Sequence, residues 1–279
     1  MVRHSYEDRL LRVLDYVYAH LDGDLSLDTL AEVAALSRFH FHRVFSGMTG
    51  ETVAGFIRRV RLSKASHLLL RSEDEIERIA LQCGYPNPRS FTRAFQDAFG
   101  LTPTAFRARG VEMPPLRLNE RGDYEMYEIT VEDRAPAAFA GVAHKGDYME
   151  IGQAFEVAAK TALSRGMGPV LGAMVGVYFS NPGEVPVEEM RSMAGFVLTG
   201  EMDLAPPLEP FSLAGGRYAV LRHIGPYTGL RQAYDYLYGK WLPESGEEPR
   251  DGPPFEIYLN SPMDTAPEDL VTLIHAPIA

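Results

Sequence analysis

Two groups of side chains in this 279-residue sequence have types and spacings that suit chemistry, and the first is an acid set among aromatic residues. Glu256 lies in the segment 255–259, where the two-residue alternation of a β-strand puts it on the same face as Tyr258. A carboxylate that lines a groove of aromatic rings suits an organic cation, through Coulomb attraction and cation–π contacts. The rings expected around it are those of Tyr148, Tyr227, Trp241 and Tyr258. The alternative, equally open from spacing alone, is a solvent-facing Glu256 with the aromatics in the core.

The second group lies in the stretch 76–107, whose pattern is typical of a helix-turn-helix. Apolar residues at helical spacing lead to a break at 83–86, and a second helix with Phe91, Phe95 and Phe99 inward follows. The early, outward side of this second helix is where a recognition helix carries the side chains that contact base edges in the major groove. The candidates there are Arg89, Ser90, Thr92 and Arg93, just after a proline at the first helical position.

An earlier stretch, 26–50, repeats this pattern. Its second helix directs Phe41, Val44 and Phe45 towards the core. The side chains left available for a DNA groove are Arg38, Phe39, His42 and Arg43. The two halves match at an offset of 50 residues (93 − 43), so two motifs in tandem are expected to meet successive major-groove segments about 10 base pairs apart.

A long helix over about 52–71 is expected to join the two motifs. It carries Arg58, Arg59, Arg61 and Lys64, which suit phosphate neutralisation. The single cysteine, Cys83, lies in the second turn; its position favours a packing role over that of an exposed redox sensor.

Charge is distributed unevenly between the two halves of the chain. The overall net charge is −11, but residues 1–110 hold 15 basic and 13 acidic side chains (+2), whereas residues 111–279 hold 12 and 25 (−13). This asymmetry favours a first half that meets DNA and a second half that meets something else. No apolar run is long enough to span a bilayer, and a cytoplasmic protein without a membrane partner is expected.

The first half resembles the AraC/XylS family of transcription regulators. The resemblance rests on IALQCGYPNPRSFTRAFQDAFGLTPTAFR and LAEVAALSRFHFHRVFSGMTGETVAGFIRRVRLSKASHLL. It implies that the eight candidate DNA residues align with base- or backbone-contacting positions, whereas Pro88 stands where the family more often has a polar residue.

The second half contains a duplication of its own. The pattern G-x-Y-x-x-[IL]-x-Q-A-[FY]-[ED] occurs at 146–156 and again at 225–235, and a later segment, 177–182, matches 257–262 at an offset of 80. Each copy is expected to contain a strand, a helix and two strands. The fold class predicted for the chain is therefore an all-α tandem helix-turn-helix domain (1–110), a linker (111–122) and an α+β domain of two pseudo-twofold repeats (123–279). Both repeat helices are expected on one face of the sheet, and Gly176 of the first copy corresponds to Glu256 of the second.

This half resembles the GyrI-like effector-binding domain, through RYAVLRHIGPYTGLRQAYDYLYGKWL and PPFEIYLNSP. The resemblance implies that Glu256 is the central pocket acid and that Tyr227, Trp241 and Tyr258 are aromatic pocket residues.

The combined expectation is a DNA-binding transcription regulator controlled by a small cationic or amphipathic effector. Its expected partners are double-stranded DNA, the effector and RNA polymerase; it is expected to be a monomer or a dimer, and no cofactor, metal or catalytic residue is predicted. Two alternatives remain: a GyrI-like hydrolase fused to a DNA-binding domain, with Glu256 as general base, and a ligand-independent regulator whose second domain binds proteins.

Overall fold

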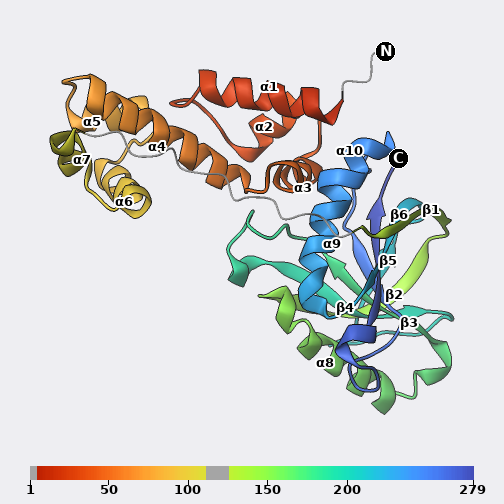
Figure 1. Ribbon diagram of the computed structural model, residues 1–279. Helices are drawn as coiled ribbons and strands as arrows, with labels where there is room; N and C mark the ends of the chain where they lie inside the picture. The colour runs from red at the N-terminus through yellow and green to blue at the C-terminus, as the bar shows by residue number, and fades with distance from the viewer. Residues whose placement is uncertain (1–4, 111–125) are drawn as a thin grey trace. The chain divides into compact units, whose positions relative to one another are not determined.

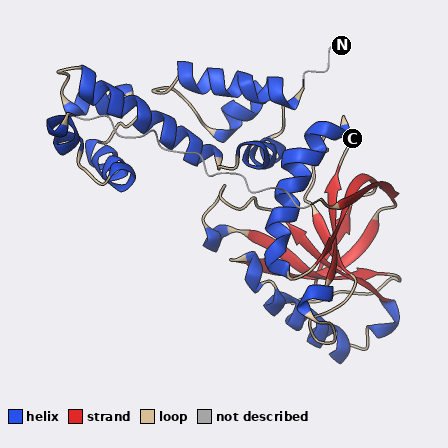
Figure 2. Cartoon of the chain, in the orientation of Figure 1, coloured by secondary structure: helices blue, strands red, loops and turns tan. Residues whose placement is uncertain are grey.

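The structure is a computed structural model that describes residues 5–110 and 126–279. The chain divides into two compact units, Met1–Gly122 and Asp123–Ala279. The linker expected at 111–122 lies outside the described residues. Strands, drawn in red in Figure 2, occur in the second unit, and the described part of the first unit is helical.

The first unit consists of two helix-turn-helix motifs joined by one long helix, α4 (Figure 1). Its helices are α1 (Tyr6–Ala19), α2 (Leu27–Ala34), α3 (Arg38–Thr49), α4 (Val53–Arg71), α5 (Ile76–Gln82), α6 (Pro88–Phe99) and α7 (Pro103–Arg109). Local sequence sets the helix ends: the Asn87 side chain accepts from the backbone N–H groups of the first turn of α6, and Gly100 ends that helix in the left-handed region. The expected tandem all-α domain is thus confirmed.

The second motif is held by a cluster of aromatic residues. Phe91 and Phe95 of α6 are fully buried against Phe106 of α7 and against α4 and α5. Cys83 belongs to the same cluster and is 0% exposed, and burial raises the pKa of its thiol to about 11. A thiol that stays protonated is a poor nucleophile, so the packing role expected for this cysteine is confirmed.

The second unit is one eight-stranded sheet in the order β1-β6-β8-β7-β3-β4-β2-β5. The strands are β1 (Glu128–Arg134), β2 (Ala137–Lys145), β3 (Leu171–Tyr178), β4 (Arg191–Leu198), β5 (Glu209–Leu213), β6 (Gly216–Ile224), β7 (Phe255–Tyr258) and β8 (Val271–Pro277). The helices are α8 (Gly152–Ser164) and α9 (Leu230–Tyr236), with the latter continuing through a π-helical turn (Leu237–Trp241) into α10 (Leu242–Ser245).

The strand order is symmetric about its centre, which confirms the two pseudo-twofold repeats. Strands β7 and β3 are the central pair, and each strand on one side has its repeat-equivalent at the same distance on the other side. The sequence patterns did not predict β5. This strand precedes β6 in the chain but pairs with β2, while β1 precedes β2 and pairs with β6, so the repeats exchange their first strands.

The two faces of the sheet have different roles. One face forms an apolar core that includes Val175, Val177, Phe255 and Ile257. The other face carries Glu256 and its neighbours, and α8 and α9 both pack on it, as expected from the duplication. None of the helices described within 5–110 and 126–279 is long and apolar enough to cross a membrane.

Candidate functional site: a buried glutamate and two recognition helices

Glu256 lies at the centre of the sheet, where the two repeats meet. It pairs across β7 and β3 with Gly176, its equivalent in the first repeat. A Cβ atom added to Gly176 would lie 3.0 Å from the Tyr178 hydroxyl and 3.2 Å from the Tyr258 hydroxyl. Because Gly176 has no side chain, the two hydroxyls fill the space beside it. Of the two equivalent positions at the centre of the sheet, only position 256 therefore carries a carboxyl group.

Three tyrosine hydroxyls surround the Glu256 carboxylate, which is only 2% exposed. Tyr258 donates to Oε2 at 2.6 Å, Tyr178 donates to the same oxygen at 3.0 Å, and Tyr234 of α9 donates to Oε1 at 3.0 Å. The hydroxyls of Tyr178 and Tyr258 are also 2.7 Å apart. These four residues are called the Glu256 cluster below.

Further aromatic rings pack edge-on around this cluster. The ring of Tyr227 lies 5.5 Å from that of Tyr258, and Phe155 of α8 contacts the same ring at 5.3 Å. Tyr148 packs against Tyr178 at 4.8 Å and donates its hydroxyl to the Ser180 carbonyl. Aromatic faces and edges around a carboxylate form the surroundings in which an organic cation gains both Coulomb and cation–π attraction.

Burial dominates the electrostatics of the Glu256 cluster. It raises the pKa of Glu256, and the hydrogen bonds from Tyr258, Tyr234 and Tyr178 offset this only in part. Burial, together with the nearby Glu256 charge, also holds the pKa values of Tyr178 and Tyr258 well above that of an ordinary tyrosine. None of the ion pairs among the described residues involves Glu256.

The structure brings most of the sequence-predicted pocket residues together. Tyr258, Tyr227 and Tyr148 belong to the cluster or its aromatic shell, whereas Trp241 ends the π-helical turn after α9. Within the described residues, no hydrogen bond or ring contact links Trp241 to the Glu256 cluster. The solvent-facing alternative for Glu256 is excluded by its burial.

Sequence reasoning missed Tyr178 and Tyr234 as site residues, although a signal was present. Tyr178 is the repeat-equivalent of Tyr258, and Tyr234 is the equivalent of Phe155. Equivalent positions of a pseudo-twofold domain converge on its axis, so the duplication itself predicts that these tyrosines lie near Glu256.

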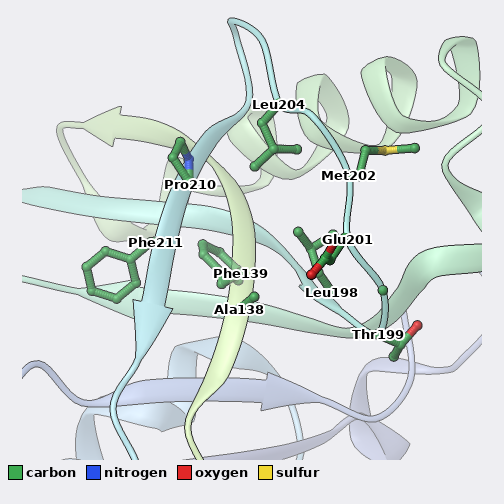
Figure 3. Close-up of a pocket in the computed structure, with 10 residues that line it drawn as sticks. Ala138, Phe139, Leu198, Thr199, Glu201, Met202, Leu204, Pro210 and Phe211 are labelled. Carbon is green, nitrogen blue, oxygen red and sulfur yellow. The ribbon is translucent and has the colours of Figure 1, made fainter.

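A pocket of about 500 Å³ lies away from these residues, at the edge of the sheet (Figure 3). Leu204 and Met202 border it from the loop between β4 and β5, opposite Phe139 and Phe211 of the strands. Its lining does not include Glu256 or any of the expected pocket aromatics. Among the described residues, no group of three or more His, Cys, Asp or Glu side chains is placed to hold a metal ion.

Helix α6 presents its predicted DNA-contacting side chains at the surface. Arg89, Ser90 and Arg93 are exposed on the side opposite the phenylalanine face. Thr92 is half-buried, and its hydroxyl donates to the Pro88 carbonyl at 2.9 Å. That bond uses the hydroxyl proton. The groups that Thr92 has left for a DNA contact are its methyl group and its hydroxyl oxygen, which can accept a hydrogen bond.

Helix α3 presents its candidates less uniformly. Arg38 is exposed and pairs with Asp28 at 3.3 Å, while the Arg43 guanidinium lies over the Phe39 ring at 4.1 Å. His42 is only 4% exposed, and its contact with a DNA groove stays a prediction. Its low exposure fits its position, because residue 42 lies about 100° round the helix from the buried Phe41. It is therefore at the edge of the core-facing side and not opposite that side.

The basic residues of α4 mostly serve the fold. Arg59 forms two hydrogen bonds with Glu51, Arg61 donates to the Leu21 carbonyl at 2.9 Å, and Lys64 donates to the Gln82 carbonyl at 3.1 Å. Only Arg58 of the four is exposed, and the other three are half-buried. Three of the four thus hold the two motifs to the connecting helix, and phosphate neutralisation stays a prediction for all four.

Comparison with known proteins identifies both units. The family model described as a GyrI-like small molecule binding domain matches residues 127–279, more than half of the chain. The chain belongs to the GyrI-like family. A helix-turn-helix domain model matches residues 30–109, ahead of the GyrI-like domain, and the AraC-type resemblance of the first unit is confirmed.

The alignments with curated relatives extend over both units. The right origin-binding protein of Escherichia coli K12 is 29% identical over 266 residues, which cover 88% of each chain. The transcriptional regulator Rob of Salmonella typhimurium is 29% identical over 261 residues, 89% of each chain. The protein is thus a DNA-binding transcription regulator with a GyrI-like domain. Among solved structures, the C-terminal domain of EcmrR covers 56% of this chain and 99% of its own, with 16% identity and a TM-score of 0.49.

Proposed function

We propose that the chain is a sequence-specific regulator whose activity changes when a small cationic or amphipathic ligand binds at Glu256. The observation that supports this proposal is the buried Glu256 carboxyl, which has tyrosine hydroxyls around it and no basic partner in its hydrogen bonds or ion pairs within the described chain. An unpaired buried carboxylate is costly, and an organic cation would offset that cost.

The proposed ligand contacts extend from Glu256 to the aromatic residues around it. They are Glu256, Tyr258, Tyr227 and Tyr148, as the sequence predicted, with Trp241 retained from the sequence and Tyr178 and Tyr234 added from the geometry. For a ligand to reach the carboxylate, at least one of the tyrosine hydroxyls that now bond it has to move aside.

Thermal-shift measurements on the full chain test the ligand class. Tetraphenylphosphonium should raise the unfolding temperature of the wild type, and neutral triphenylphosphine oxide should not. Glu256→Gln should abolish the shift, while Glu268→Gln, which changes an exposed carboxylate, should keep it. Equal shifts in the wild type and Glu256→Gln would refute the role of the acid.

Turnover of an electrophilic ligand, followed by mass spectrometry, would support the hydrolase alternative.

For DNA, we propose that α3 and α6 each enter a major groove. The proposed contacts are Arg38, Phe39, His42 and Arg43 of α3, with His42 the least accessible, and Arg89, Ser90, Thr92 and Arg93 of α6. Selection of bound sequences from a random DNA pool supplies the operator. Arg93→Ala should then cost about 1–3 kcal/mol of discrimination at one half-site, whereas an equal loss on all sequences would assign Arg93 to phosphate.

We propose RNA polymerase as the protein partner. A ligand alters transcription only when its affinity differs between two states of the regulator, so two readouts are needed. Operator affinity with and without tetraphenylphosphonium tests a change in DNA binding. Unchanged DNA affinity combined with changed transcription in a purified polymerase assay would place the effect at the polymerase contact.

A further inference from the structure

The Glu256 cluster contains a closed triangle of oxygen atoms. Its corners are Oε2 of Glu256 and the hydroxyls of Tyr178 and Tyr258, and its sides are 3.0, 2.7 and 2.6 Å. Each of these separations is a normal hydrogen-bond distance between two oxygens. All three oxygen–oxygen contacts are therefore favourable only when a proton lies between each pair of oxygens.

The number of protons in the triangle decides the charge of Glu256. The hydroxyls of Tyr178 and Tyr258 supply two protons, so an ionised Glu256 leaves one side with two oxygen lone pairs facing each other in a buried site. A third proton on Oε2 completes the ring if the bond between Tyr178 and Oε2 reverses. Glu256 then donates to Tyr178, Tyr178 donates to Tyr258, and Tyr258 donates back to Oε2, at the same oxygen–oxygen distances. Tyr234 donates to Oε1 and is compatible with this arrangement.

The surroundings of the ring also favour a neutral glutamate. The groups that face it from the packed elements are uncharged: Tyr178 from β3, Tyr258 from β7, Tyr234 from α9, Tyr227 ahead of α9, Phe155 from α8, and Tyr148 ahead of α8. Burial raises the pKa of Glu256, in the same direction as the proton count. No described basic side chain makes an ion pair with this carboxyl that would hold it ionised.

We propose that the GyrI-like domain binds its cation by exchange: the ligand-free Glu256–Tyr178–Tyr258 ring holds one proton, and a bound monocation replaces that proton. This inference rests on the proposed function and adds its regulation. The proton leaves Oε2 for the solvent, the cation takes its place beside the carboxylate, and the net charge of the buried site is unchanged. Protons and cations then compete for the site, so the affinity for a cation falls as pH is lowered. The affinity for a neutral ligand does not depend on pH in this way.

Calorimetric titration of the full chain with tetraphenylphosphonium tests the exchange, because this permanent cation cannot itself carry the proton. Titrations at one pH near 7, in phosphate and in Tris, should give different observed enthalpies. The dependence on buffer ionisation enthalpy should correspond to about one proton released per cation bound. Below the pH at which the ring deprotonates, affinity should fall about tenfold per pH unit. Glu268→Gln, an exposed carboxylate changed in the same way, should release the same number of protons.

Infrared difference spectroscopy supplies an independent measurement. The wild-type minus Glu256→Gln spectrum should show the C=O band of a protonated carboxyl, and tetraphenylphosphonium should convert it to carboxylate bands. Cation binding without proton release, with carboxylate bands already present in the free protein, would overturn the exchange and leave the proposed function intact. Absence of binding at every pH would overturn both. The wild-type buffer dependence decides the question even if Glu256→Gln does not fold.

Discussion

Burial of the Glu256 carboxyl raises its pKa, so the ligand-free protein is more stable with this side chain protonated than ionised. A group whose folded pKa lies above its unfolded value stabilises the protein below the unfolded pKa, and that contribution is lost as pH rises through the folded pKa. Glutamine at this position cannot ionise. Glu256→Gln should therefore gain in unfolding temperature relative to the wild type as pH is raised above the ordinary glutamate value of 4.5 and through the raised folded pKa.

Thermal unfolding of both proteins across this pH range, without ligand, is the measurement. A difference that does not change with pH would mean that Glu256 has the same protonation behaviour in the folded and unfolded chains. Gain of stability with loss of cation binding is the combination expected of a residue retained for function.

His275 makes a second, opposite contribution to pH dependence. The side chain is fully buried on β8 and stacks on Phe255, with Arg134 2.7 Å from its Nε2. Burial, reinforced by the Arg134 charge, lowers the pKa of His275 to about 3. Since arginine only donates, Nε2 accepts, and Nδ1–H donates to the Leu273 carbonyl.

Nitrogen NMR should therefore show His275 as the neutral Nδ1–H tautomer down to about pH 4. Because the folded pKa is depressed, this residue stabilises the domain above the unfolded value of 6.5, and the contribution declines as pH falls from there towards about 3. Titration of His275 near its ordinary pKa in the folded protein would contradict the buried arrangement.

At the scale of elements, the turn between α5 and α6 depends on a glycine in a crowded left-handed conformation. Gly84 has φ +73°, and a Cβ atom there would lie 2.3 Å from the Leu21 carbonyl and 2.6 Å from the Arg61 guanidinium. That Cβ would push Arg61 of α4 off the carbonyl of Leu21, in the loop before α2, to which it now donates. Gly84→Ala should thus add a steric cost to the ordinary cost of a positive φ.

Gly100→Ala is the matched control, because Gly100 has φ +71° and no atom within 4 Å of the position of an added Cβ. It should cost about 1 kcal/mol, whereas Gly84→Ala should cost at least about 2 kcal/mol more. Urea unfolding of the full chain measures both. Equal losses would show that the turn relaxes around the added methyl group.

Elements were predictable where local pattern decides them. The helical spacing of Phe91, Phe95 and Phe99 and the capping residues gave α6, and the duplication gave both repeats and their shared helical face. Strand β5 was not predictable in this way, because it has only five residues, contains Pro210 and pairs outside its own repeat.

Side-chain partners were less predictable than elements. Arg61 lies on a helix with other basic residues and has the composition of a phosphate contact, yet its partner is the Leu21 carbonyl, 40 residues away. Similarly, Trp241 is aromatic and close in sequence to Tyr234, but the π-helical turn between them changes the helical phase that a sequence pattern assumes. Long-range pairing and local helix irregularity leave no periodic signal.

At the scale of the whole molecule, the DNA-binding unit is one body built around α4. This helix has 19 residues, or about 28 Å at 1.5 Å per residue, comparable to one turn of DNA. Lys64 fastens it to the end of α5, Arg61 to the loop before α2, and Arg107 of α7 donates to the Leu69 carbonyl near its end. A connector fixed to both motifs allows one separation between α3 and α6.

The operator should therefore tolerate no change in half-site spacing. Insertion of 5 base pairs turns one half-site to the opposite side of the duplex, and insertion of 10 restores the face but adds a full turn of distance. A stiff α4 spans neither, so both insertions should lower the affinity of the full chain at least about tenfold, to that of an operator with one half-site scrambled. Fluorescence anisotropy with the three altered operators and the original one measures this. Recovery of affinity with the 10-base-pair insertion alone would show that α4 bends or unwinds. A flexible connector would tolerate a larger half-site separation when both half-sites face the same side of the DNA, whereas a stiff connector would not.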